Sequence, residues 1–198
     1  MPTLIAAVSY DKKSVLLLIA AALIVSVLAA GCTSNTGTTS PSPSAATNTY
    51  TSTQGFTLKY PSDWGKPQEQ QNGKLVVFTL PTNNVTENFN VQVAALASNV
   101  TLASVTKNIT STAQSYRNFV LLSPSENTTL SKLAAANYLY QATVDGSPLN
   151  VLQTWTVKDG KAYVITYKAG YGDGTVNNNT FVKYQKTAQQ MIDSFQIT

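Results

Sequence analysis

Few side chains in this sequence have the chemistry of a catalytic group. The 198 residues include no histidine, which excludes Ser-His-Asp and Cys-His arrangements and every zinc or iron site with an imidazole ligand. Ser104 and Lys107 match the S-x-x-K spacing, in which a lysine helps to deprotonate a serine one helical turn away. The S-D-N and K-T-G segments that complete this motif are missing, and the carboxylates form no close pair for glycoside hydrolysis. We therefore expect no catalytic residues.

A glycine-rich segment, Gly170–Gly174, could hold an ion or a phosphate group. A dinucleotide-binding loop would need a glycine at position 175, where the chain has Thr175. Asp173, Thr175 and Asn177 supply oxygen atoms at alternate positions, as calcium ligands do. An EF-hand would also need a glutamate where the chain has Tyr184. We expect a glycine-rich connection with no cofactor and no metal, and weak calcium binding is the alternative.

Aromatic side chains are numerous enough to contact a sugar or another flat ligand. Most of the ten tyrosines and two tryptophans fall at positions expected in the core, whereas Trp64 and Tyr171 fall in predicted turns. We group these two with Asp173, Thr175 and Asn177 as the candidate ligand-binding loop. Packing beneath a loop is the alternative for both aromatic residues.

The charge pattern argues against nucleic acid as a partner. Lysine and arginine number 13 against nine acidic residues, and the basic residues are spread along the chain. Binding to a phosphate backbone requires a concentrated basic surface, which this spacing does not predict.

The N-terminus has the features of an export signal. Lys12 and Lys13 precede an apolar run over residues 15–30, which ends in the sequence LAAGC at Cys32. This ending resembles a lipobox, so we expect residues 1–31 to be a cleaved signal peptide and Cys32 to carry the lipid anchor, such as palmitate. The alternative is an uncleaved transmembrane helix, although the run is shorter than the roughly 20 residues of a usual span. Both interpretations place the domain at the extracytoplasmic face of the cell membrane.

Residues 32–49 and the five sequons are typical of the exposed part of an exported protein. Serine, threonine and proline dominate residues 32–49, which predicts an extended tether before a globular domain over residues 50–198. Five N-x-[ST] sequons make the domain a candidate for N-glycosylation. Together with the lipobox they suggest an archaeal surface lipoprotein. The sequon residues are Asn84, Asn99, Asn108, Asn127 and Asn178.

The periodicity of the domain predicts an α+β fold. Alternating or continuous apolar residues indicate about six strands, three of them before a helix and three in a meander with Asp-Gly turns. In one of the early strands, Asn90 and Gln92 alternate with apolar residues. A stripe with helical spacing runs from Leu102 to Val120, and another closes the chain. We expect an antiparallel sheet flanked by two main helices. The predicted strands are Gly55–Pro61, Leu75–Leu80, Phe89–Ala95, Ala134–Val144, Leu149–Val157 and Lys161–Lys168, and the second stripe is Phe181–Phe195.

Two short motifs resemble a known family. The segment Gly55–Trp64, a strand followed by proline and tryptophan, resembles the opening of PsbP-like domains, and the helix with Ile192–Phe195 resembles their closing helix. The resemblance covers roughly residues 50–198 and implies an α/β/α sandwich of the PsbP/Mog type. Such domains occur in bacterial and archaeal lipoproteins of unknown role, while plant and cyanobacterial members are extrinsic photosystem II subunits. The residues of that photosynthetic role, some of them histidines, have no match here.

The functional hypotheses follow from these observations. The first is a non-catalytic surface lipoprotein that binds another envelope protein. The second is a protein that binds a small ligand or calcium, with the loop at 170–178 as its site. A hydrolase with an unrecognised arrangement of residues is the third and weakest.

The N-terminal prediction can be tested by the intact mass of the protein purified from its native membrane. We expect a mass that starts at Cys32 and includes a lipid, because a single acyl chain binds membranes only marginally and stable anchoring requires more. A mass that retains residues 1–31 and carries no lipid would instead identify a single-span membrane protein.

Overall fold

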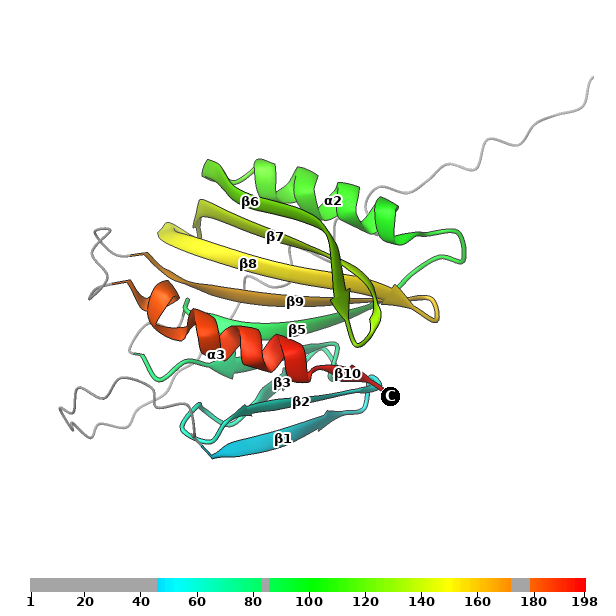
Figure 1. Ribbon diagram of the computed structural model, residues 1–198, viewed down its shortest axis with the longest axis horizontal. Helices are drawn as coiled ribbons and strands as arrows, with labels where there is room; N and C mark the ends of the chain where they lie inside the picture. The colour runs from blue at the N-terminus through cyan, green and yellow to red at the C-terminus, as the bar shows by residue number, and fades with distance from the viewer. Residues whose placement is uncertain (1–45, 83–85, 172–178) are drawn as a thin grey trace, which may run out of the picture.

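Two antiparallel sheets and two helices make up the described part of the chain (Figure 1). The computed structural model describes residues 46–82, 86–171 and 179–198, apart from the side chains of residues 124–127. The larger sheet has seven strands in the order β3-β4-β5-β9-β8-β7-β6, and the smaller has three in the order β1-β2-β10. In chain order the elements are β1 (Thr47–Ser52), β2 (Phe56–Pro61), β3 (Gln68–Gln70), β4 (Leu75–Thr79), β5 (Asn88–Ala95), α2 (Leu102–Gln114), β6 (Arg117–Leu130), β7 (Leu133–Val144), β8 (Ser147–Lys158), β9 (Lys161–Gly170), α3 (Thr180–Ser194) and β10 (Gln196–Ile197).

The predicted fold class, an antiparallel sheet flanked by two helices, is confirmed. The prediction of about six strands is wrong, because β1, β3, β6 and β10 add to the six that were expected. Two of the additional strands are very short, and β1 begins at Thr47, three residues before the predicted start of the domain. Within the described residues no helix is long and apolar enough to cross a membrane, and the apolar run at 15–30 lies outside them.

The first helix is shorter than its apolar stripe predicted. Helix α2 ends at Gln114, and the chain then enters the 14-residue strand β6 instead of continuing as a helix to Val120. Asn118 adopts a positive φ of 54°, and the pairing of β6 with β7 shifts register at three places. These irregularities interrupt the alternation by which a strand is recognised in a sequence, so the helical spacing of Tyr116 and Val120 was misleading.

The predicted meander is confirmed, including its two Asp-Gly turns. Asp145 and Gly146 have φ values of 50° and 79°, and Asp159 and Gly160 have values of 50° and 69°. Positive φ at both central residues is the geometry of a type I′ turn, whose twist matches that of the strands it joins. Strands β7, β8 and β9 therefore pair along almost their whole length.

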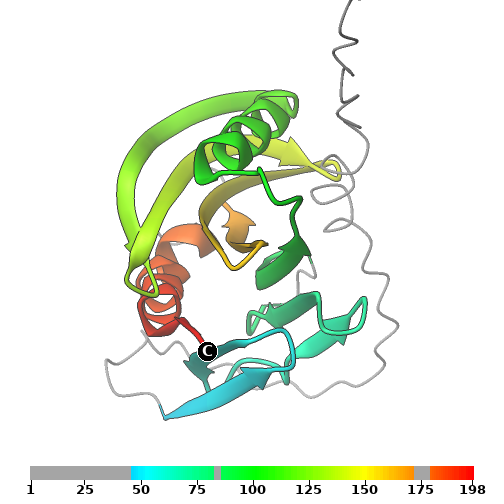
Figure 2. The same ribbon diagram turned by 90° about the vertical axis from the view of Figure 1, so that its right-hand side faces the viewer.

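The larger sheet carries a different layer on each face (Figure 2). On one face, α3 and the smaller sheet enclose an aromatic core that includes Phe56, Phe89 and Phe195. On the other face, α2 buries Val105, Ile109 and Ala113 against β7 and β8. Strand β5, between these layers, is buried on both sides.

Helix α2 is also fixed to the sheet by a hydrogen bond. The indole N–H of Trp155 on β8, a fully buried side chain, donates to the Thr106 hydroxyl at 2.9 Å. Buried indole groups usually require such an acceptor. The bond therefore sets the position of α2 along the strands it covers.

Replacing Thr106 with valine should lower the free energy of unfolding by roughly 1–3 kcal/mol, because the buried N–H of Trp155 would lose its acceptor while the side chain keeps its shape. Urea unfolding of the wild type and the Thr106→Val variant measures this change in free energy. Thr110→Val is the matched control, since the Thr110 hydroxyl bonds only to carbonyls of its own helix. Equal effects of the two substitutions would contradict the role given to the Trp155–Thr106 bond.

Candidate functional site

The central strands turn a group of polar side chains toward α2, inside the protein. The register places Asn90 of β5 beside Thr166 of β9, and Thr166 beside Gln153 of β8. Two residues further along, Lys168 pairs with Asn88. Asn88, Asn90 and Lys168 are all buried. Because buried polar groups are costly unless they are hydrogen-bonded, this cluster requires an explanation.

Hydrogen bonds connect most of the polar cluster. The Tyr140 hydroxyl donates to Oε1 of Gln153 at 3.3 Å, and Nε2 of Gln153 donates to the Thr166 hydroxyl at 3.1 Å. Nδ2 of Asn90 donates to Oδ1 of Asn88 at 2.9 Å. Thr166 acts as an acceptor here and Asn90 uses one of its two amide hydrogens, so each keeps the capacity to donate another bond.

Lys168 differs from the rest of the cluster. Its side chain is 7% exposed, and its ammonium group makes no hydrogen bond or ion pair with the described residues. The ammonium nitrogen keeps some contact with solvent, because no fully buried side-chain nitrogen or oxygen among the described residues lacks a partner. Burial lowers the pKa of Lys168, and the negative charge of Asp145, which lies in an exposed turn, partly opposes that shift. A buried lysine without a carboxylate beside it is unusual because desolvation strongly disfavours the charged form.

A cavity of ≈ 70 Å³ lies between this polar cluster and α2. Its floor is formed by Asn90, Gln92, Gln153, Thr166 and Lys168, and its rim includes the partly exposed Asn108 and Tyr116. The rest of the lining is apolar and comes from α2 and the neighbouring strands. These residues are Ala94, Leu96, Val105, Ile109, Tyr140, Val144, Val151, Ala162 and Val164.

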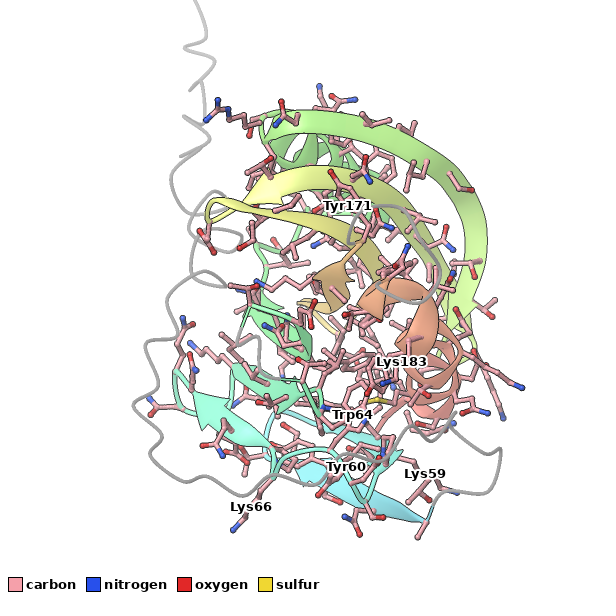
Figure 3. The ribbon with its side chains drawn as sticks, turned by 90° about the vertical axis from the view of Figure 1, so that its left-hand side faces the viewer. Lys59, Tyr60, Trp64, Lys66, Tyr171 and Lys183 are labelled. Carbon is pink, nitrogen blue, oxygen red and sulfur yellow. The ribbon has the colours of Figure 1, made fainter. Side chains whose placement is uncertain are left out.

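Trp64 and Tyr171, the two described residues of the predicted ligand-binding loop, do not line this cavity. Trp64 is buried in the aromatic core, where its ring meets that of Tyr184 edge-on at 6.1 Å. Tyr171 is half-buried at the end of β9, and Figure 3 shows it well separated from Trp64. The other three members, Asp173, Thr175 and Asn177, lie outside the described residues.

The S-x-x-K motif has a structural explanation. The backbone N–H of Ser104 donates to the Thr101 hydroxyl at 3.2 Å, which caps the N-terminus of α2. The Ser104 hydroxyl lies 3.1 Å from that of Thr101, and Lys107 is exposed. The described contacts therefore do not join the two residues: Ser104 belongs to the helix cap, and Lys107 lies on the solvent-facing side of the helix.

The other predicted sites fall in different parts of the chain. Among the sequon residues, Asn99 is exposed and Asn108 lies at the rim of the cavity. Asn127 is in β6, but its side chain is not described. Cys32, Asn84 and Asn178 lie outside the described residues. Within the described part of the chain, no group of three or more Cys, Asp or Glu residues could hold a metal ion.

Sequence reasoning missed the cavity and Lys168. Asn90 and Gln92 had been assigned to the polar side of an alternating strand, and Lys168 marked the end of another. The available signal was the repetition of this pattern in two strands, at Asn88, Asn90 and Gln92 and again at Thr166 and Lys168. The strands lie side by side only in the tertiary structure, which brings the two polar rows into one cluster.

Comparisons with known proteins agree with this architecture. The sequence matches the family described as PsbP-like protein over residues 14–197. Cyanobacterial PsbP from Synechocystis is similar in structure, with 17% identity, a TM-score of 0.56, and coverage of 82% of this chain and 98% of that one. The Ran-binding protein Mog1p of Saccharomyces cerevisiae has 8% identity, a TM-score of 0.54, and coverage of 78% and 96%. Among curated protein sequences, none matches this chain.

Replacing Lys168 with methionine should raise the free energy of unfolding by roughly 1–3 kcal/mol at neutral pH, because a buried charge without a partner is removed while the volume is kept. The pKa of Lys168 is lowered in the folded state, so the unfolded chain binds more protons between that pKa and the usual 10.5. The stability of the wild type therefore rises with pH across this window, and the gain from the substitution shrinks.

Urea unfolding of both proteins at several pH values measures this effect. Lys186→Met on α3, which removes an exposed lysine, is the control and should change stability by less than about 0.5 kcal/mol. A less stable Lys168→Met protein would show that the ammonium group has a stabilising partner.

Proposed function

The chain belongs to the PsbP-like protein family, and from that premise we propose that it is a membrane-anchored, non-catalytic accessory protein that binds a small molecule in the cavity beneath α2. The observation that carries the proposal is Lys168, a buried cation that faces the cavity without a partner among the described residues. A residue of this kind costs stability, and proteins retain such residues mainly where function needs them.

The composition of the cavity also supports a binding role. Small-molecule sites are concave and mostly apolar, and a few polar groups fix the orientation of the ligand. Here aliphatic side chains form the wall, and polar side chains converge on the floor. A gap left by imperfect packing of the core would be lined by apolar groups throughout, since protein interiors normally exclude unpaired charges.

Location at the extracytoplasmic face of the membrane forms the second part of the proposal. The apolar run at 15–30, the lipobox ending at Cys32 and the tether at 32–49 support it. The family match begins at residue 14 and therefore includes these features. On this arrangement, lipid at Cys32 holds the chain at the membrane while the tether lets the domain reach soluble ligands.

The binding proposal can be tested with a variant that fills the cavity. Val164 lines the cavity on β9, so Val164→Phe should occupy the space that a ligand needs while retaining a residue that favours strands. We expect native mass spectrometry of the full chain from its native membrane to show a bound small molecule in the wild type but not in this variant.

Val182→Phe is the matched control, because Val182 on α3 is 47% exposed and lies away from the cavity. This variant should keep the bound molecule. A wild-type protein without any bound molecule, or a Val164→Phe protein that binds as the wild type does, would contradict the proposal.

A protein partner in the envelope is the second candidate function. It is favoured by three consecutive apolar residues, Val120, Leu121 and Leu122, which are 50%, 41% and 48% exposed on the edge strand β6. Exposed apolar groups on an unpaired edge can accept an extended segment of another protein.

Replacing Leu121 with lysine tests this second candidate in the same purification from the native membrane. We expect the variant to lose a protein partner bound at this edge and to keep a ligand bound in the cavity.

A further inference from the structure

The charge balance of the cavity indicates the sign of its ligand. Among the described residues that line the cavity, Lys168 is the one lysine or arginine, and none is an aspartate or glutamate. The two lining tyrosines, Tyr116 and Tyr140, have pKa values raised by burial, so they are neutral and supply no negative charge. Asp145 acts on Lys168 only through the longer-range electrostatic interaction already described. A ligand with one negative charge would compensate the ammonium group.

The polar floor favours a carboxylate. Next to Lys168, Thr166 and Asn90 each retain the capacity to donate a hydrogen bond after the bonds they already make. A carboxylate has two oxygen atoms, which can be shared between an ammonium group and such neutral donors. A phosphate or sulfate ion has four, and its remaining oxygens would face aliphatic groups and stay unsatisfied.

The wall of the cavity favours an apolar chain on that carboxylate. Leu96, Val105, Ile109 and Val164 contribute aliphatic surface opposite the polar floor. Burying a methylene group against such surface contributes about 0.8 kcal/mol, so each carbon of a short chain adds to affinity. A compact polar acid would gain nothing from these side chains.

The volume of the cavity limits the length of the chain. A single water molecule needs roughly 10–15 Å³ by the same measure, so ≈ 70 Å³ accommodates about five to seven groups of that size. A carboxylate takes about three of these places and a chain of about two to four carbons takes the rest, so hexanoate fills the cavity and places its last carbon at the rim. A long-chain fatty acid would extend beyond the rim at Asn108 and Tyr116.

We propose that the cavity beneath α2 is selective for a short-chain aliphatic monocarboxylate, whose carboxylate pairs with Lys168 and whose chain lies against α2. This inference rests on the proposed function, since it specifies the ligand of the same cavity. It also explains why Lys168 lacks a protein partner: the ligand provides the missing negative charge.

The experiment compares hexanoate with hexanamide, which has the same chain and a neutral head group, by amide NMR titration of the full chain. We expect hexanoate to shift the signals of β8, β9 and α2 and to bind at least about tenfold more tightly than hexanamide. Lys168→Met should abolish this preference, whereas Lys186→Met should retain it. Hexanoate affinity should also fall as the pH rises through the lowered pKa of Lys168, and that fall should be absent in Lys168→Met.

The other outcomes separate this inference from the proposed function. Equal binding of hexanoate and hexanamide would overturn the selectivity for an anion and leave the cavity as a binding site. Failure of both to bind, in a protein that carries a molecule when purified from its membrane, would overturn the ligand class alone. Failure of both in a protein that carries no molecule would overturn both proposals. Binding of inorganic phosphate as tight as that of hexanoate would contradict the role of the apolar wall.

Discussion

Strand β5 lies between two packed layers, and all of its residues except Ala95 are buried. Successive side chains of a strand point to opposite faces, so one face of β5 supplies Phe89, Val91 and Val93 to the aromatic core, and the other presents Asn88, Asn90 and Gln92 to the interior near α2. These polar side chains are largely removed from bulk water. They must bond to one another or to something that enters the cavity, and the rest of the site follows from this requirement.

The two faces of the larger sheet contribute in different ways. On the face of α3, aromatic rings pack closely, as in the stacked pair Tyr167 and Phe181 at 4.8 Å and the pair Phe56 and Phe195 at 5.2 Å. Such contacts contribute beyond the area they bury. The face of α2 is less completely packed and contains the cavity, together with a buried cation that costs stability. The aromatic half therefore offsets the cost of keeping a polar cavity in the other half.

Helix α2 links the fold to the site. Its apolar residues Val105 and Ile109 belong both to the packed cluster on β7 and β8 and to the wall of the cavity. The bond from Trp155 to Thr106 fixes the helix over the sheet, and the cap at Thr101 fixes where the helix starts. A small change in the position of the helix would alter the shape of the cavity, so the same contacts that stabilise the domain determine what it can bind.

The sequence by itself determined the family and the fold class. The motif at Gly55–Trp64, the meander with its Asp-Gly turns and the helical stripes depend on local geometry, which neighbouring residues specify. Strand β6 was not predicted, because the register shifts in its pairing with β7 disturb the alternation of apolar and polar residues along it. Only the tertiary structure decided that Asn90 and Lys168 are buried together. Alternation along a strand shows that its two faces differ, but what covers each face depends on segments distant in the sequence, here α2 on one side and α3 with the smaller sheet on the other.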